Sequence, residues 1–144
     1  MRHGYGKWFW NDGTFRHGNT YEGDFKDDEM TGRGVFRWAN GDVYEGGFLE
    51  GNMEGLGWLK GMDGKSYYGE WSNDKLNGFG VQLWKDKVLY AGQYRDGLFE
   101  GEGDYFDEDG RRFQGLFEGD KLNGVVVVSY PGKKEKGLWV NSVR

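Results

Sequence analysis

Few side chains in this sequence have the types and spacing that catalysis or metal binding requires. The only histidines are His3 and His17, and there is no cysteine, so the sequence offers no typical zinc ligand set. None of the serines lies in a Gly-x-Ser-x-Gly setting, which argues against a nucleophile elbow. The acidic clusters at 27–29 and 107–110 lack the alternating ligand spacing of a calcium loop. We therefore predict no enzyme activity, no catalytic residue, no metal site and no cofactor.

The abundant glycines do not form a nucleotide-binding loop either. No Gly-x-Gly-x-x-Gly fingerprint and no phosphate-loop lysine motif is present. Instead, Gly-x-Gly pairs return every 23 residues, which favours a structural role and leads to the elements that contain them. Internal repeats of this length are typical of repeat architectures.

The repeat holds several columns in register over five copies. An aromatic residue opens each copy, a glycine follows two residues later, and a second aromatic follows two residues after that. The opening residues are Tyr21, Tyr44, Tyr67, Tyr90 and Phe113, and the second aromatics are Phe25, Phe48, Trp71, Tyr94 and Phe117. The predicted structural glycines are Gly23, Gly32, Gly34, Gly46, Gly55, Gly57, Gly69, Gly78, Gly80, Gly92, Gly101, Gly103, Gly115 and Gly124.

Each copy has the pattern of a β-hairpin. Period-two alternation of apolar and polar residues predicts a first strand with one apolar face, and the Gly-x-Gly pair begins a second strand rich in β-branched and aromatic types. Asn-Gly and Asp-Gly pairs, as at 40–41 and 63–64, supply the backbone angles of tight turns. An isolated hairpin is marginal in water, so we predict an all-β fold, an elongated single-layer antiparallel sheet of consecutive hairpins.

The glycines also predict how one layer buries its own rings. Glycine within a strand persists where another group approaches the backbone closely. We expect rings from one strand to lie flat in the space that the paired glycines of a neighbouring strand leave open.

Composition and charge limit the possible partners. The net charge of −5 divides into about −4 for residues 1–72 and about −1 for residues 73–144, so neither half has the basic character of a nucleic-acid binder. No segment is apolar for long enough to span a bilayer, and the first residues lack the pattern of a signal peptide. We predict no nucleic-acid partner and a cytoplasmic location.

The motif "YEGDF…TGRGVFRWANGDV", echoed by "YEGGF…EGLG" and "YYGEW…NGFG", resembles the MORN repeat, the membrane occupation and recognition nexus motif. The resemblance implies a curved or rod-like antiparallel sheet that serves as a scaffold, dimerises or cradles a partner's helix. It also implies association with the cytoskeleton or with a membrane.

The repeat predicts one array over residues 1–144 with incomplete copies at both ends. We expect both edges of the sheet to be open, because the chain is a fragment of a longer array or because the edges pair with another chain. An added loop or bulge is predicted at "FRHGN", residues 15–19. The predicted units are a partial repeat at 1–20, full repeats at 21–43, 44–66, 67–89, 90–112 and 113–134, and a partial repeat at 135–144.

The sequence thus predicts a non-enzymatic protein–protein interaction or scaffold module that presents an aromatic-rich sheet face to a partner protein or to a second copy. Two alternatives stay open: a peripheral membrane module that recognises acidic phospholipids, and a regulatory repeat domain of a larger enzyme. The predicted partner-binding residues are Tyr44, Phe48, Tyr67, Trp71, Tyr90 and Tyr94.

Overall fold

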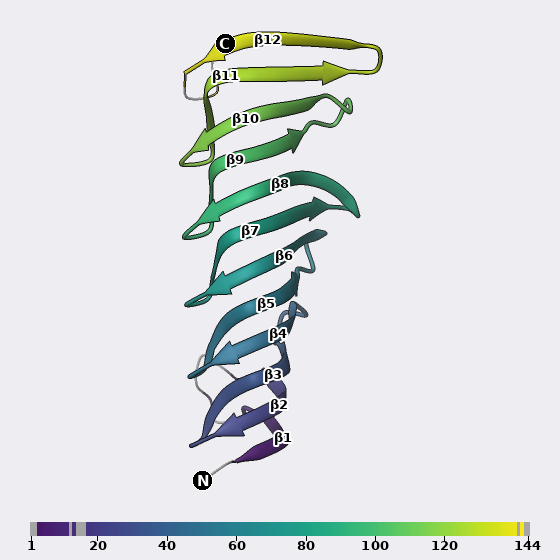
Figure 1. Cartoon of the computed structure of the whole chain (residues 1–144). Coiled ribbons are helices and arrows are strands. Elements are labelled where there is room, and N and C mark those ends of the chain that lie inside the picture. Colours follow the sequence, from purple (N-terminus) through teal and green to yellow (C-terminus); the bar gives the residue numbers. More distant parts are fainter. Residues whose placement is uncertain (1–2, 12, 14–16, 141, 143–144) are drawn as a thin grey trace.

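The computed structural model describes residues 3–11, 13, 17–140 and 142, and these residues form one sheet of twelve antiparallel strands (Figure 1). Every strand pairs with the strands that precede and follow it in the sequence, and no helix occurs within the described residues. The predicted elongated sheet of consecutive hairpins is confirmed. The strands are β1 (Gly4–Phe9), β2 (Thr20–Lys26), β3 (Glu29–Arg37), β4 (Val43–Leu49), β5 (Asn52–Lys60), β6 (Lys65–Ser72), β7 (Lys75–Trp84), β8 (Lys87–Arg95), β9 (Leu98–Phe106), β10 (Arg112–Glu118), β11 (Lys121–Tyr130) and β12 (Lys133–Trp139).

One face of the sheet, called the inner face here, carries the buried core. The core consists of three opening aromatics, all five second aromatics and apolar residues of the second strands, packed without a covering layer. Edge-to-face ring contacts join neighbouring copies, as between Tyr21 and Phe48, whose centroids lie 5.1 Å apart. Successive side chains of every strand alternate between this face and the opposite one, which we call the outer face.

A continuous row of glycines crosses the inner face. In each strand from β1 to β9, one glycine is the direct partner of a glycine in the next strand. In β11 the corresponding place is taken by Val126, which is fully buried and pairs with Gly137 of β12. The row consists of Gly6, Gly23, Gly34, Gly46, Gly57, Gly69, Gly80, Gly92, Gly103 and Gly115.

Three opening tyrosines, Tyr21, Tyr44 and Tyr90, lie in this row and are fully buried. Each phenol occupies the space where a Cβ would stand on the glycine of the next strand. The glycines concerned are Gly34, Gly57 and Gly103, respectively. Each hydroxyl also donates to the backbone carbonyl three residues onward, at 2.7 to 3.0 Å. The glycine row therefore lets a single layer bury large rings, as the sequence predicts.

The two glycines of each pair have different tasks, which corrects the prediction that both make room for rings. Gly57 faces the Tyr44 ring, whereas a Cβ at Gly55 would meet nothing within 4 Å. Gly55 has a φ of 79° and lies in a bulge, because Gly46 pairs with Gly57 while Phe48 pairs with Met53. It supplies a left-handed backbone angle that other residues adopt at a cost.

The tight turns along one side of the sheet connect the two strands of each copy, and they hydrogen-bond to the previous copy. The eighth position of each full copy has positive φ, whether it is glycine or aspartate. Asp74 donates its backbone N–H to the Met53 carbonyl at 3.2 Å, and its carboxylate accepts from the Met53 N–H at 2.8 Å. Asp120 holds Phe99 in the same way. Aspartate thus stabilises this turn, because its side chain accepts a hydrogen bond from a backbone N–H of the previous copy.

The first loop is held by backbone bonds. Trp10 N–H donates to the Asn19 carbonyl at 3.0 Å, and Gly18 N–H donates to the Trp10 carbonyl at 2.7 Å. The predicted added loop at 15–19 lies partly outside the described residues. β1 and β12 form the two edges of the described sheet.

Candidate functional site

Five of the six predicted partner-binding rings lie in the core. Tyr44, Phe48, Trp71, Tyr90 and Tyr94 are all at most 6% exposed, and the Trp71 indole N–H donates to the Gly57 carbonyl at 3.0 Å. They form the floor of the inner face, and a direct contact between them and a partner stays a prediction. Tyr67 alone of the six is half-buried.

Tyr67 belongs to a row of half-buried apolar residues that runs along the inner face, on the side opposite the tight turns. We call this row the inner stripe and define it as Trp38, Leu59, Tyr67, Tyr105 and Phe113. Direct strand pairing links Leu59 to Tyr67 and Tyr105 to Phe113. Burial raises the pKa of the Tyr67 hydroxyl, and the nearby Asp63 carboxylate adds to the rise.

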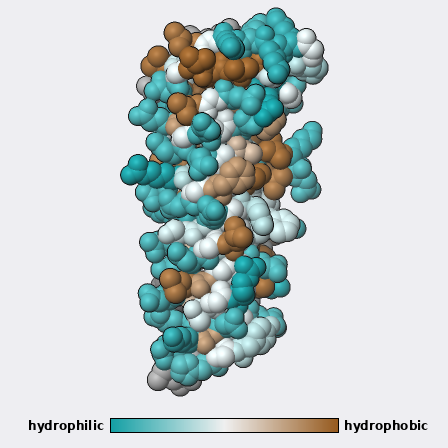
Figure 2. Space-filling view, viewed as in Figure 1, coloured by the Kyte–Doolittle hydropathy of each residue, from teal (hydrophilic) through white to brown (hydrophobic). Residues whose placement is uncertain are grey.

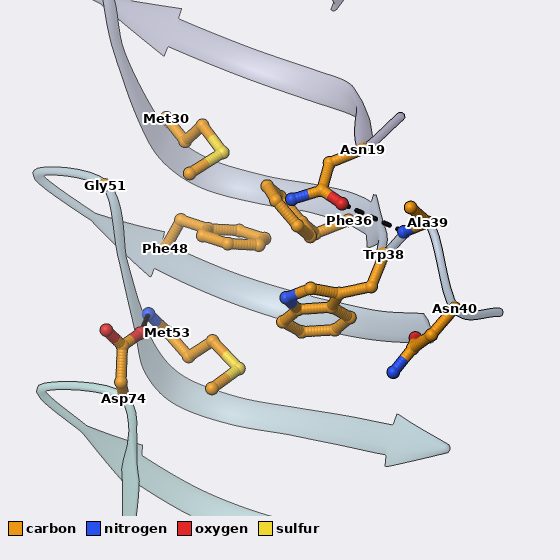
Figure 3. A pocket seen from close by; sticks show the side chains of 10 residues that line it. All are labelled: Asn19, Met30, Phe36, Trp38, Ala39, Asn40, Phe48, Gly51, Met53 and Asp74. Atoms are coloured by element: carbon orange, nitrogen blue, oxygen red, sulfur yellow. Dashed lines mark hydrogen bonds between the residues drawn. The ribbon is translucent and has the colours of Figure 1, made fainter. Parts of the chain in front are cut away.

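A hollow lies at the start of the inner stripe, and residues in and next to β3, β4 and β5 line most of it. Met30, Phe36, Trp38, Phe48 and Met53 line an open depression of about 490 Å³ (Figure 3). Its polar groups are already engaged, because Asn19 Oδ1 accepts from the Ala39 N–H at 2.9 Å and Asp74 from Met53. Methionine and aromatic side chains of this kind suit an apolar side chain of a partner.

Two more hollows continue the inner stripe. Leu59, Met62 and Tyr67 line one of about 370 Å³. The other, of about 720 Å³, contains Tyr105 and a charged wall. Burial alone would raise the pKa of Asp107 in that wall, but hydrogen bonds and the charge of Arg111, 2.6 Å away, lower it. The three hollows lie one after another along the array, which suits an extended partner rather than a small ligand.

Sequence reasoning did not single out four of the five stripe residues. A signal was present for Leu59 and Tyr105, because the sixteenth position of each copy reads Phe36, Leu59, Gln82, Tyr105 and Val128, mostly apolar with the same period. Period alone identifies the face but does not separate buried from half-buried positions on it.

Lysines from separate parts of the sequence meet beside two tryptophans. Lys65 and Lys85 place their ammonium groups 5.9 and 5.4 Å from the Trp84 ring centroid, and Lys60 lies 5.9 Å from that of Trp58. Lys87 pairs with Trp84 across the β7–β8 hairpin. Three cation–π contacts and one strand pairing thus gather four positive charges at one end of the middle strands.

No metal-binding cluster is found among the described residues. His3 Nε2 lies 3.4 Å from an Asp27 carboxylate oxygen on the surface, and no group of three potential metal ligands forms in the described part of the chain. A search of the same residues finds no helix long and apolar enough to cross a membrane.

The sequence profile of the MORN repeat matches residues 1–15, 21–43, 44–66, 67–87 and 90–110, which is more than half of the chain. The chain belongs to the MORN repeat family. A comparison with curated proteins finds no match. MORN repeats generally take part in protein–protein or membrane-lipid interactions, and the fold is known as a non-enzymatic interaction module.

Proposed function

We propose that this MORN array is a non-enzymatic interaction module that binds an extended segment of a partner protein, such as a helix, along the inner stripe. The observation that carries the proposal is the succession of half-buried rings and open hollows along one side of the inner face. Partly exposed aromatic residues over a rigid floor are frequent anchors of protein interfaces.

Tyr67 and Tyr68 offer a matched test because they are adjacent and lie on opposite faces. A photo-crosslinking amino acid at Tyr67 should give discrete protein adducts in a cell extract, whereas the same group at Tyr68 should give none of those adducts. The Tyr67→Ala variant should then bind the captured partner at least about tenfold more weakly, as an anchor residue would. Identical adducts from both positions would refute the proposed surface.

A second candidate function is binding to a membrane surface that contains acidic phospholipids. The observation that favours it is the edge cluster of Lys60, Lys65, Lys85 and Lys87 beside Trp58 and Trp84. Each lysine near an anionic surface is worth about 1 kcal/mol, and tryptophan suits the headgroup region.

Vesicle co-sedimentation separates the two candidates. The lipid candidate requires binding to phosphatidylserine-containing vesicles that weakens with salt, is absent from neutral vesicles and is lost in a Lys65→Glu, Lys85→Glu, Lys87→Glu variant. A Lys133→Glu, Lys134→Glu variant changes charge on another hairpin and serves as the control. Binding that survives the triple change would exclude this edge as the lipid site.

A further inference from the structure

The outer face of the middle strands carries an apolar patch of which only Trp58 enters a function proposed above. Leu56 and Trp58 of β5, Tyr68 of β6 and Phe79 of β7 are 55, 44, 50 and 53% exposed. Trp58 and Tyr68 are direct cross-strand partners. Hydrophobic residues are visible in the middle of the array in Figure 2, between hydrophilic ones. We call these four residues the outer patch.

The charge inside the outer patch is turned toward the backbone. Glu70 pairs with Leu56 on the same face, and its Oε2 accepts from the Phe79 N–H at 3.1 Å. The carboxylate is thereby tied to the bulge beside it, and large apolar groups dominate the patch. Exposed apolar patches of several hundred square ångströms on a soluble chain mark interaction surfaces.

We propose that the outer patch is the centre of a two-fold interface between two copies of this chain, packed outer face to outer face with the arrays antiparallel. The proposal goes beyond the inner-stripe function and does not depend on it. The charges on either side of the patch favour a second copy of the chain as its occupant.

Arg33 and Glu102 are placed symmetrically about β6. Arg33, Leu56, Phe79 and Glu102 each directly precede a glycine of the row, on β3, β5, β7 and β9, so they occupy one column of the outer face. Arg33 and Glu102 are both exposed, and their backbone positions lie three strands, about 14 Å, on either side of β6. In the single chain the Arg33 guanidinium reaches across β4 and donates to the Leu56 carbonyl at 3.3 Å.

A two-fold axis along β6 therefore makes the outer face self-complementary. It brings Arg33 of each copy opposite Glu102 of the other, Leu56 opposite Phe79, and Tyr68 opposite its own counterpart. An isologous interface requires this matching of a surface with itself, and the paired charges set the antiparallel register. The two inner stripes then point away from each other and remain free.

Size also agrees with a dimer contact. A large aromatic side chain has about 150–250 Å² of surface, so the four half-exposed patch residues offer about 400 Å². That is about half of the 800 Å² that a standard interface takes from each partner. The columns between Arg33 and Glu102 supply the remainder.

A single cysteine tests the position of the axis, since the chain has no cysteine of its own. Under mild oxidation, Tyr68→Cys should form an interchain disulfide within the dimer, because the axis brings the two sulfurs together. Glu45→Cys is the matched control: it is exposed in the same column of the outer face, but on β4, two strands from the axis. Equal cross-linking of both variants would overturn the proposed axis.

Charge exchange tests the register in sedimentation equilibrium of the full chain at low salt. Arg33→Glu and Glu102→Arg should each weaken dimerisation by about tenfold or more, because each places like charges opposite one another twice. The double variant should restore dimerisation to within a few fold of the original. Absence of rescue would overturn the antiparallel register.

Sedimentation equilibrium also tests the apolar centre of the proposed interface. Leu56→Glu should abolish the dimer, whereas Leu138→Glu, at an exposed leucine on β12 far from the axis, should leave it intact. If Leu56→Glu lowers the melting temperature, Tyr68→Lys on β6 replaces it. A chain that stays monomeric at its highest soluble concentration, or a dimer insensitive to both patch variants, would overturn the proposal.

Discussion

The second and third copies of the repeat begin with the same residue type and treat it differently. Tyr44 lies in the glycine row, is fully buried and donates from its hydroxyl to the Gly47 carbonyl at 3.0 Å. Tyr67 occupies the equivalent position in the sequence but is half-buried in the inner stripe. The nearest ring to Gly80, the row glycine of the third copy's second strand, belongs to Tyr94 of the fourth copy.

The presence of Tyr94 beside Gly80, in place of Tyr67, has a cost and a consequence. Tyr94 is only 4% exposed, and its hydroxyl is buried without a hydrogen-bond partner. A buried hydroxyl in this state loses the hydration it has in the unfolded chain. In return, Tyr67 reaches the surface in the middle of the array. A repeat column therefore fixes the strand and the face of a side chain, whereas competition for the glycine row decides whether that side chain is core or surface.

Filling the row in the second copy should give the largest effect on stability. In Gly57→Val the new side chain occupies the place of the Tyr44 phenol, so the ring must leave its seat. We expect a loss of about 3 kcal/mol in the free energy of unfolding, as for severe overpacking of a core. Urea unfolding followed by tryptophan fluorescence measures the change.

Gly55→Asn provides the control for this substitution. Gly55 has open space around its Cβ position and needs only a left-handed backbone angle, which asparagine tolerates better than other residues. Its loss should remain below about 1 kcal/mol. Similar losses in Gly57→Val and Gly55→Asn would mean that the row does not act as a ring seat.

Removing a single tyrosine hydroxyl should change stability by less, and we expect Tyr44 and Tyr94 to respond differently. Tyr44→Phe leaves the Gly47 carbonyl without its donor and should cost about 1 kcal/mol. Tyr94→Phe removes a buried group that has no partner, so it should be neutral or stabilising. Equal losses for the two variants in urea unfolding would contradict the difference between the seats.

Much of the fold is predictable from the sequence because each 23-residue copy repeats the same signals for strands, faces and turns. Tyr44, Gly46 and Phe48 alternate with polar residues, so the strand, its face and its glycine are all visible. Asn-Gly and Asp-Gly pairs mark the turns. Five copies then repeat the same local information, and neighbour-to-neighbour stacking completes the sheet.

The candidate site is less predictable, because it depends on differences between copies. Nothing in the residue types of Tyr44 and Tyr67 shows that one ring fills the glycine row and the other does not. Likewise, Lys65 is distant in the sequence from Lys85 and Lys87, and only strand pairing brings it beside them at Trp84. The different roles of Gly55 and Gly57 follow from a bulge that period-two patterns do not encode.

The smallest predicted effect comes from ionisation of a buried tyrosine, and it appears only at alkaline pH. Burial raises the pKa of Tyr44 to about 12, against about 10 in an unfolded chain. A raised pKa means that the fold favours the neutral phenol. Its contribution is therefore fully present below about pH 10 and is lost as the pH rises toward about 12.

The Tyr44→Phe variant should accordingly lose less stability than the original chain between about pH 10 and pH 12, because one buried group no longer ionises. Melting temperatures measured across this interval, with phenolate absorbance as a second probe, report the slope. Tyr94→Phe tests the other seat in the same way, since burial raises the pKa of Tyr94 as well. A pH slope unchanged by Tyr44→Phe would show that the hydroxyl in the glycine row is already open to solvent before the chain unfolds.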